Sequence, residues 1–327
     1  MAHLKNRSTP CEVCIPRREW YKTSCQLHCQ VYIPGNVAMK LKTELAIKAA
    51  IEAQAPAAWS RKNFEALLKQ HREAWGAPQS LTTSGLIEFL IDNEIVRPVE
   101  IQSKAYDRKM RYVLGRPSPL QFALSFFKDS YLSHASALEV HGLGSSEMTY
   151  VNREQSPKKT TSRLSQGRID MAFENQPRRS AFEFVSGSFR VTFLNGKHTG
   201  DAGVIEMPGP SAERVRVTSL ERTFIDCVVR PQYAGGIAKV AAAYRDGAHR
   251  VSIPDLVLLL KKTKYVYPYH QTIGFLLQMA GRTEEDLKPL LSLGLRFKFY
   301  LDYGMEAPAF DPHWKLYYPA GLASTTF

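Results

Sequence analysis

The chain has 327 residues, of which 44% are hydrophobic and 11% aromatic, and its formal net charge at pH 7 is +12. The length excludes one ordinary domain and suits two or three, and the composition permits real hydrophobic cores. The basic balance favours an acidic partner, either nucleic acid or an acidic protein surface.

Segments that would direct the chain to a membrane are missing from the sequence. No run of about 18 apolar residues predicts a spanning helix, and the N-terminus lacks the apolar stretch of a signal peptide. We therefore expect a cytoplasmic protein with no membrane partner. Four of the five cysteines fall in the first 29 residues and the fifth, Cys227, takes an apolar helical position. This distribution does not predict a disulfide framework.

The first 38 residues contain the cysteines Cys11, Cys14, Cys25 and Cys29. A C-x2-C pair followed by two more soft ligands is typical of a small tetrahedral zinc site, because thiolates at this spacing can bind one ion. The remaining spacing is irregular, and little apolar sequence surrounds it. Alternatively, Met39 is the natural start and residues 1–38 are translated upstream sequence. We favour this second interpretation and expect no cofactor.

Residues 39–116 have the pattern of three short helices followed by a hairpin. Apolar residues at helical spacing predict a helix over residues 40–54, and Ser60 can cap a second one. The third helix begins in the hydroxyl-rich stretch at Ser80, and two alternating runs after it predict a two-stranded ribbon. This order predicts a winged helix-turn-helix domain that binds DNA.

The candidate DNA contacts are the hydroxyls at the start of the third helix and the cations of the ribbon. A helix start can enter the major groove while the ribbon lies against backbone phosphate. Residues 97–116 hold six Lys or Arg and two Asp or Glu, which gives a net charge of +4. Each cation that meets a phosphate releases roughly 0.9 counterions, so binding would be salt-sensitive. The predicted DNA-binding residues are Ser80, Thr82, Thr83, Ser84, Arg97, Lys104, Arg108, Lys109 and Arg111. The alternative is a solvated hairpin whose charges only maintain solubility.

Residues 117–327 predict a larger mixed domain with an antiparallel sheet. The predicted strands are residues 169–173, 181–185, 189–194, 203–207 and 214–217, separated by Gly, Asn and Pro. A capping box, Thr218 to Glu221, then begins a helix that ends at Arg230 and Pro231. Further helices follow, so the fold class is α+β. His134 and His141 lack metal-ligand spacing, and we expect them to pack or cap.

Three motifs in this domain resemble a known family. They are Y-L-S-H-A-S-A-L…H-G-L over residues 131–143, V-T-S-L-E-R-T-F-I-D over residues 217–226, and Arg230-Pro…Gly235-Gly236. In that order they are similar to the AbiEi-type antitoxins of bacterial abortive-infection (type IV toxin-antitoxin) systems. The resemblance runs from about Met39 to the C-terminus. The head before Met39 departs from the family pattern.

The resemblance implies a function in phage defence. It implies an N-terminal winged helix that binds inverted repeats in double-stranded promoter DNA as a transcriptional repressor. It also implies an AbiEi-like C-terminal domain, residues 117–327 here, that supports repression and antitoxicity. The implied partner is a nucleotidyltransferase toxin encoded beside it.

The sequence lacks the motifs of the common enzymes. It has no phosphate-binding Gly-Lys-Ser/Thr loop, no H-E-x-x-H helix and no G-x-S-x-G elbow. A nucleotidyltransferase needs two carboxylates on one strand, and Asp170 supplies only one. We expect Glu221 and Asp226 to cap and to pair with Arg222 rather than to catalyse. We therefore predict a protein that is not an enzyme; the alternatives are a metal-dependent nuclease and a stand-alone adaptor of phage defence.

Overall fold

The computed structural model describes residues 39–54, 56–156 and 164–322. All of these described residues belong to one compact unit. The four predicted zinc ligands and the question of upstream translation therefore lie outside the described residues. The described part mixes helices with sheets, which confirms the α+β class. None of its helices is long and apolar enough to cross a membrane.

The predicted helices and hairpin of residues 39–116 are present, although their interpretation as a winged helix-turn-helix remains a prediction. The elements are α1 (Leu41–Glu52), β1 (Ala57–Trp59), α2 (Arg61–His71), α3 (Thr83–Asp92), β2 (Val96–Ile101) and β3 (Lys109–Leu114). Their strands form an antiparallel sheet in the order β1-β3-β2. The sequence did not predict β1, because a strand of three residues is too short for alternation to be visible.

Local chemistry explains where these helices begin. Ser60 and Asn63 form a capping box at the start of α2, and the Thr82 side chain accepts a hydrogen bond from the Gly85 amide at the start of α3. Such caps satisfy amide groups that have no partner within the helix. Phe64 and Leu86 are fully buried between the helices, in a cluster that extends to Leu114 of β3. The three helices and the sheet therefore share a core.

A six-stranded mixed sheet lies at the centre of the remaining chain. The elements from residue 119 to residue 218 are α4 (Pro119–Leu124), β4 (Tyr131–Leu132), α5 (His134–Val140), β5 (Thr149–Glu154), α6 (Gln166–Glu174), β6 (Glu183–Ser186), β7 (Phe189–Gly196), β8 (Val204–Pro208) and β9 (Arg214–Thr218). The strand order is β6-β7-β5-β4-β9-β8. Two of its pairs, β5 with β7 and β4 with β9, are parallel, whereas the sequence predicted an antiparallel sheet.

One predicted strand of this region is wrong. Residues 169–173 belong to helix α6, in which Ile169 and Phe173 are both buried. These two residues are four positions apart, which places them on one side of a helix. The predictions at residues 181–185, 189–194, 203–207 and 214–217 are confirmed, with small shifts at their ends, by β6, β7, β8 and β9.

The C-terminal part is largely helical. It contains α7 (Leu220–Val229), α8 (Ile237–Gly247), α9 (Ile253–Thr263), α10 (Tyr269–Met279), α11 (Glu284–Leu291) and the small strands β10 (Phe299–Tyr300), β11 (Ala309–Asp311) and β12 (Leu316–Tyr318). Helix α7 ends before Arg230, as predicted. Its cap differs from the prediction, because Ser219 accepts the Arg222 amide and Glu221 instead accepts the Ser252 amide.

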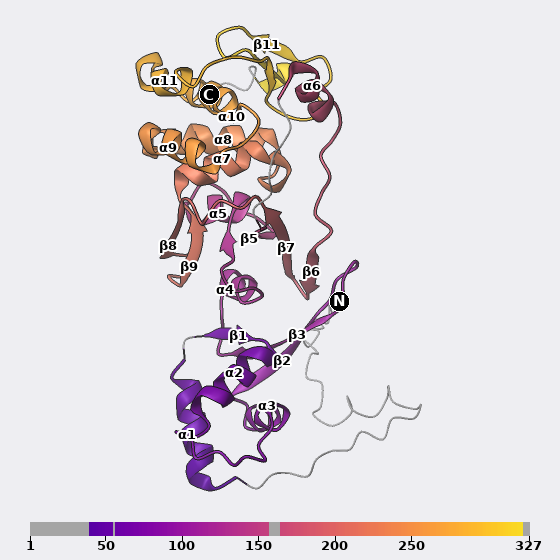
Figure 1. The fold of residues 1–327 in the computed structure, drawn as a ribbon, viewed down its shortest axis with the longest axis vertical. Coiled ribbons are helices and arrows are strands. Elements are labelled where there is room, and N and C mark those ends of the chain that lie inside the picture. Colours follow the sequence, from indigo (N-terminus) through magenta and orange to yellow (C-terminus); the bar gives the residue numbers. More distant parts are fainter. Residues whose placement is uncertain (1–38, 55, 157–163, 323–327) are drawn as a thin grey trace, which may run out of the picture. The chain divides into compact units, whose positions relative to one another are not determined.

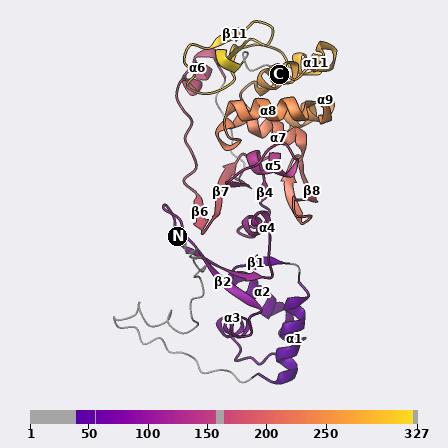
Figure 2. The same ribbon diagram turned by 180° about the vertical axis from the view of Figure 1, so that it is seen from behind.

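Helices cover both sides of the six-stranded sheet. In Figure 1 and in the reverse view of Figure 2, α4 lies on one side, and α5 with α7 to α11 lies on the other. The α4 side is a phenylalanine-rich cluster that includes Phe126, Phe184 and Phe193. Ile101 and Val113 of the hairpin belong to the same cluster. The hairpin therefore contributes to the core of the larger region as well as to its own.

Candidate nucleic-acid interface

The four hydroxyl residues predicted to meet DNA lie at the start of α3. Ser80 and Thr82 are exposed, and Thr83 and Ser84 are half-buried. Because the helix begins at Thr83, Ser80 lies in the preceding turn. Thr82 accepts the Gly85 amide at 3.1 Å, and Ser84 Oγ accepts a hydrogen bond from Arg61 Nη1 at 2.8 Å. Two of the four hydroxyls thus have local partners, and all four remain at the surface in part.

The rest of the fold fixes the position of this helix start. Arg72 donates to the carbonyl of Leu81 at 2.9 Å and also to the carbonyl of Pro78, which holds the turn before α3. Leu86 and Leu90 on the opposite face are fully buried. The first turn of α3 is therefore presented on a rigid support, as a helix that enters a groove requires.

Three of the predicted cations of the hairpin are open to solvent. Arg97, Lys104 and Arg108 are exposed, and Arg108 forms a surface ion pair of 3.4 Å with Glu100. Lys109 is half-buried, with its Nζ atom 5.7 Å from the centre of the Phe184 ring. Arg97, Lys104 and Arg108 can meet a phosphate without a change in the fold.

Arg111 does not lie where the prediction placed it. Its side chain is buried, with 7% of its surface exposed, and its guanidinium lies 4.5 Å from the centre of the Phe126 ring. It donates hydrogen bonds to the carbonyls of Met110 and Phe126. Burial lowers the pKa of Arg111. In this position Arg111 packs the hairpin onto the larger region and is not available to DNA.

The end of the hairpin pairs with the edge of the six-stranded sheet. Gln102 and Val185 form an antiparallel bridge with amide-to-carbonyl distances of 2.9 and 2.8 Å. Ser186 Oγ donates to the carbonyl of Glu100, and the ring of Tyr106 lies 4.5 Å from that of Phe182. The end of the hairpin is therefore bound to the sheet. A ribbon that contacts only phosphate would have a free end.

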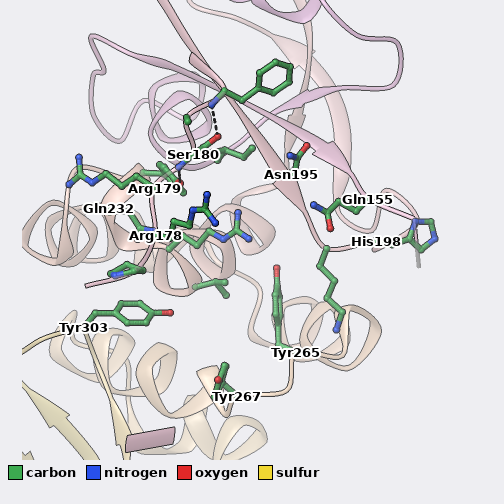
Figure 3. Close-up of a pocket in the computed structure, with 18 of the residues that line it drawn as sticks. Gln155, Arg178, Arg179, Ser180, Asn195, His198, Gln232, Tyr265, Tyr267 and Tyr303 are labelled. Carbon is green, nitrogen blue, oxygen red and sulfur yellow. Dashed lines mark hydrogen bonds between the residues drawn. The ribbon is translucent and has the colours of Figure 1, made fainter. Parts of the chain in front are cut away.

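A second site, which the sequence did not predict, is a pocket of about 840 Å³ beside this contact. Figure 3 shows Arg178 and Arg179 on one side of it, with Tyr265, Tyr267 and Tyr303 facing them from below. The pair Arg178-Arg179 and the tyrosine-rich run of residues 265–269 are visible in the sequence. Nothing in the sequence places these two segments together, because about 90 residues separate them.

A buried polar network adjoins this pocket through Tyr265. Arg222 Nε donates to Asp226 Oδ1 at 2.9 Å, and both side chains are almost fully buried, which confirms the predicted ion pair. Tyr265 donates its hydroxyl to the same carboxylate oxygen at 3.3 Å. Arg222 also bonds to Thr199 Oγ1 and to the carbonyl of Ala202. The network therefore connects α7 to the pocket wall.

The two histidines that were expected to pack are both buried. His141 Nε2 donates to the carbonyl of Thr218 at 2.8 Å, and His134 Nδ1 lies 2.9 Å from Ser133 Oγ. Burial lowers the pKa of His134 to about 4. Across residues 39–54, 56–156 and 164–322, no group of three His, Cys, Asp or Glu side chains could hold a metal ion.

Comparisons with known proteins show a structural likeness but no family. No protein-family model and no curated protein matches the chain. The fold is similar to the crystal structure of the RV2827C protein from Mycobacterium tuberculosis, with 14% sequence identity and a TM-score of 0.49. The match covers 87% of this chain and 94% of that one.

Proposed function

We propose that this chain binds double-stranded DNA through the first turn of α3 and acts as a transcriptional repressor and antitoxin without enzymatic activity. One observation carries the DNA-binding part. A hydroxyl-rich helix start with Thr83 and Ser84 is held on a buried support, and the exposed Arg97 lies on the strand that follows this helix. Helix starts and cations of this kind contact base edges and phosphates.

The order of the elements supports this proposal. Three helices followed by a hairpin are what a winged helix-turn-helix needs, with one helix in the major groove and a ribbon on the backbone. The chain is also basic overall, with a net charge of +12. This charge favours an early, non-specific attraction to DNA.

The hairpin has two roles in this proposal. Arg97, Lys104 and Arg108 contact phosphates, since their side chains are exposed. Lys109 and Arg111 attach the hairpin to the phenylalanine-rich cluster and do not contact DNA. The interface is therefore smaller than the sequence alone predicted.

The wider role rests on the resemblance to AbiEi-type antitoxins. Two of the motifs that carry it lie mostly in β4, α5, β9 and α7, where most of their residues are buried, and the third, residues 230–236, lies between α7 and α8. Repression of a promoter with inverted repeats, and opposition to a nucleotidyltransferase toxin, are accordingly parts of the proposal that the interface itself does not specify.

An electrophoretic shift assay with the chain's own upstream DNA tests the proposal. The full chain should bind this duplex more tightly than an unrelated one. The double variant Thr83→Ala/Ser84→Ala should lose about tenfold or more in affinity, because a good base contact contributes about 1–3 kcal/mol. The matched control is Ser188→Ala/Ser211→Ala, which removes two hydroxyls from exposed turns and should bind like the wild type.

Other results would support the competing functions. A folded protein that binds neither duplex would support an adaptor that holds a protein partner. Magnesium-dependent cleavage of plasmid DNA by the pure protein would support a nuclease. For the antitoxin role, co-expression should restore growth of cells that express the nucleotidyltransferase encoded beside this chain. Failure to restore growth would remove that part and leave DNA binding intact.

A further inference from the structure

The pocket beside the hairpin is built from segments that are distant in sequence. One wall is the stretch of residues 177–182, which leads into β6. The opposite wall is the turn of residues 265–269 between α9 and α10, together with Tyr303. We call it the Arg-Tyr pocket. Its volume of about 840 Å³ lies within the range of roughly 300–1,000 Å³ that is usual for small-molecule sites.

The Arg-Tyr pocket is positively charged. Arg178, Arg179, Lys197 and Arg230 line it, and no described residue of its lining is an Asp or Glu. Within the described part of the chain, no carboxylate forms an ion pair with any of these four cations. Four cations gathered without counter-charges favour an anion, and arginine forks match the geometry of a phosphate.

The aromatic side chains of the Arg-Tyr pocket are held in place. The hydroxyl of Tyr265 is bound to Asp226, and Lys197 Nζ lies 5.4 Å from the centre of its ring. The hydroxyl of Tyr233, which follows α7, accepts the Ser180 amide at 2.7 Å and so holds the wall of residues 177–182. A ring that is already fixed loses little freedom when a flat ligand stacks on it.

One polar atom of the lining lacks a partner. Gln232 Oε1 is buried, and no described residue donates a hydrogen bond to it. A buried carbonyl oxygen without a donor is costly unless a ligand supplies one. An amino group on an aromatic base could do so.

We propose that the Arg-Tyr pocket binds a nucleotide. The phosphate lies against Arg178, Arg179 and Lys197, the base stacks on a tyrosine of the 265–269 turn, and Gln232 accepts from its amino group. Proteins that bind single nucleotides or unpaired strands combine aromatic rings, on which the bases stack, with cations that contact the phosphates. A paired duplex does not fit, because its bases are stacked on each other. The ligand is therefore a free nucleotide or an unpaired nucleotide of a strand, and this site is separate from α3.

Calorimetric titration of the full chain tests this proposal and distinguishes the two sources. The probes are AMP, adenosine, inorganic phosphate and a 5′-phosphorylated four-nucleotide RNA. AMP should bind at least tenfold more tightly than either adenosine or phosphate, because both halves of the pocket contribute. If the RNA binds tenfold more tightly than AMP, the source is a strand; if the two are equal, it is a free nucleotide. No binding of AMP or RNA at millimolar concentration would overturn the proposal.

A pair of charge-matched variants separates the pocket from general attraction. Arg178→Ala/Arg179→Ala should lower the affinity for AMP or the RNA, whichever binds more tightly to the wild type, at least tenfold. Lys261→Ala/Lys262→Ala removes the same charge from an exposed part of α9 outside the pocket and should change affinity less than twofold. Equal losses in the two variants would overturn the proposal. Circular dichroism should show both variants folded, since all four side chains are exposed.

Discussion

The guanidinium of Arg111 lies over the ring of Phe126, 4.5 Å from its centre, and donates to the carbonyl of the same residue. This contact joins the hairpin to the segment that follows α4. It changes the role of a residue that the sequence placed on DNA, because the cation now stabilises the fold. The exposed Arg97, Lys104 and Arg108 remain the hairpin cations of the proposed interface.

Replacing Arg111 by Ala should therefore destabilise the protein. The variant loses a desolvated cation-π contact and buried hydrogen bonds, so we expect a loss of about 2–4 kcal/mol in the free energy of unfolding. Urea denaturation measures it. The control is Arg108→Ala, whose exposed ion pair with Glu100 contributes little, so its stability should change by less than about 0.5 kcal/mol. Equal effects in the two variants would show that Arg111 is not a packing residue.

The buried ion pair of α7 gives a second prediction. Asp226→Asn leaves the guanidinium of Arg222 buried without its counter-charge, because Arg222 is only 1% exposed. Removing one partner of such a pair typically costs about 3–5 kcal/mol. Thermal denaturation measures the loss, with Glu206→Gln, which disrupts the exposed pair with Arg214, as the matched control. A variant as stable as the control would contradict a buried network adjoining the pocket.

The stability of the protein should depend on pH through His134. Burial lowers the pKa of His134 from 6.5 to about 4. Between these pH values the unfolded chain binds a proton at His134 that the folded chain does not. The contribution of His134 to the free energy of unfolding is therefore complete above pH 6.5 and is lost as the pH falls to 4. The linkage amounts to roughly 3 kcal/mol.

His134→Asn tests this dependence by urea denaturation at several pH values. Asn is a suitable replacement because His134 has a φ of 53°, a conformation that Asn tolerates better than most residues. The variant should lose less stability than the wild type between pH 6.5 and 4. Some dependence should remain, since burial also lowers the pKa of His141. An identical fall in both proteins would contradict the account.

The helices were predictable because their signals are local. The N-cap residues of α2, α3 and α7 are Ser60, Thr82 and Ser219, and they lie at or near the predicted helix starts. Pro231 follows the end of α7, as predicted. The mistake at residues 169–173 has a local cause as well, because a short apolar run fits a strand and a helix equally. The parallel strand pairs could not be predicted, since pairing depends on distant segments.

The candidate site was predictable only in part, and β3 shows why. Alternation along β3 puts Met110 and Arg111 on opposite faces, and the predicted DNA contact required Arg111 to be on the open one. The structure reverses this, with Met110 41% exposed and Arg111 buried. The strand has a core on both sides, Leu114 facing the helices and Val113 facing the larger region. A single sequence cannot reveal a second buried face, because that face is formed by residues far along the chain.

The salt dependence of duplex affinity, measured by fluorescence anisotropy with the upstream DNA, is the most direct test of the proposed interface. Arg97→Ala/Lys104→Ala should lower the slope of log Kobs against log salt by about 0.9 for each lost phosphate contact. Lys261→Ala/Lys262→Ala removes the same charge elsewhere and should leave the slope unchanged. If the Arg97 and Lys104 variant keeps the wild-type slope, or if both double variants lower it equally, the hairpin does not contact DNA.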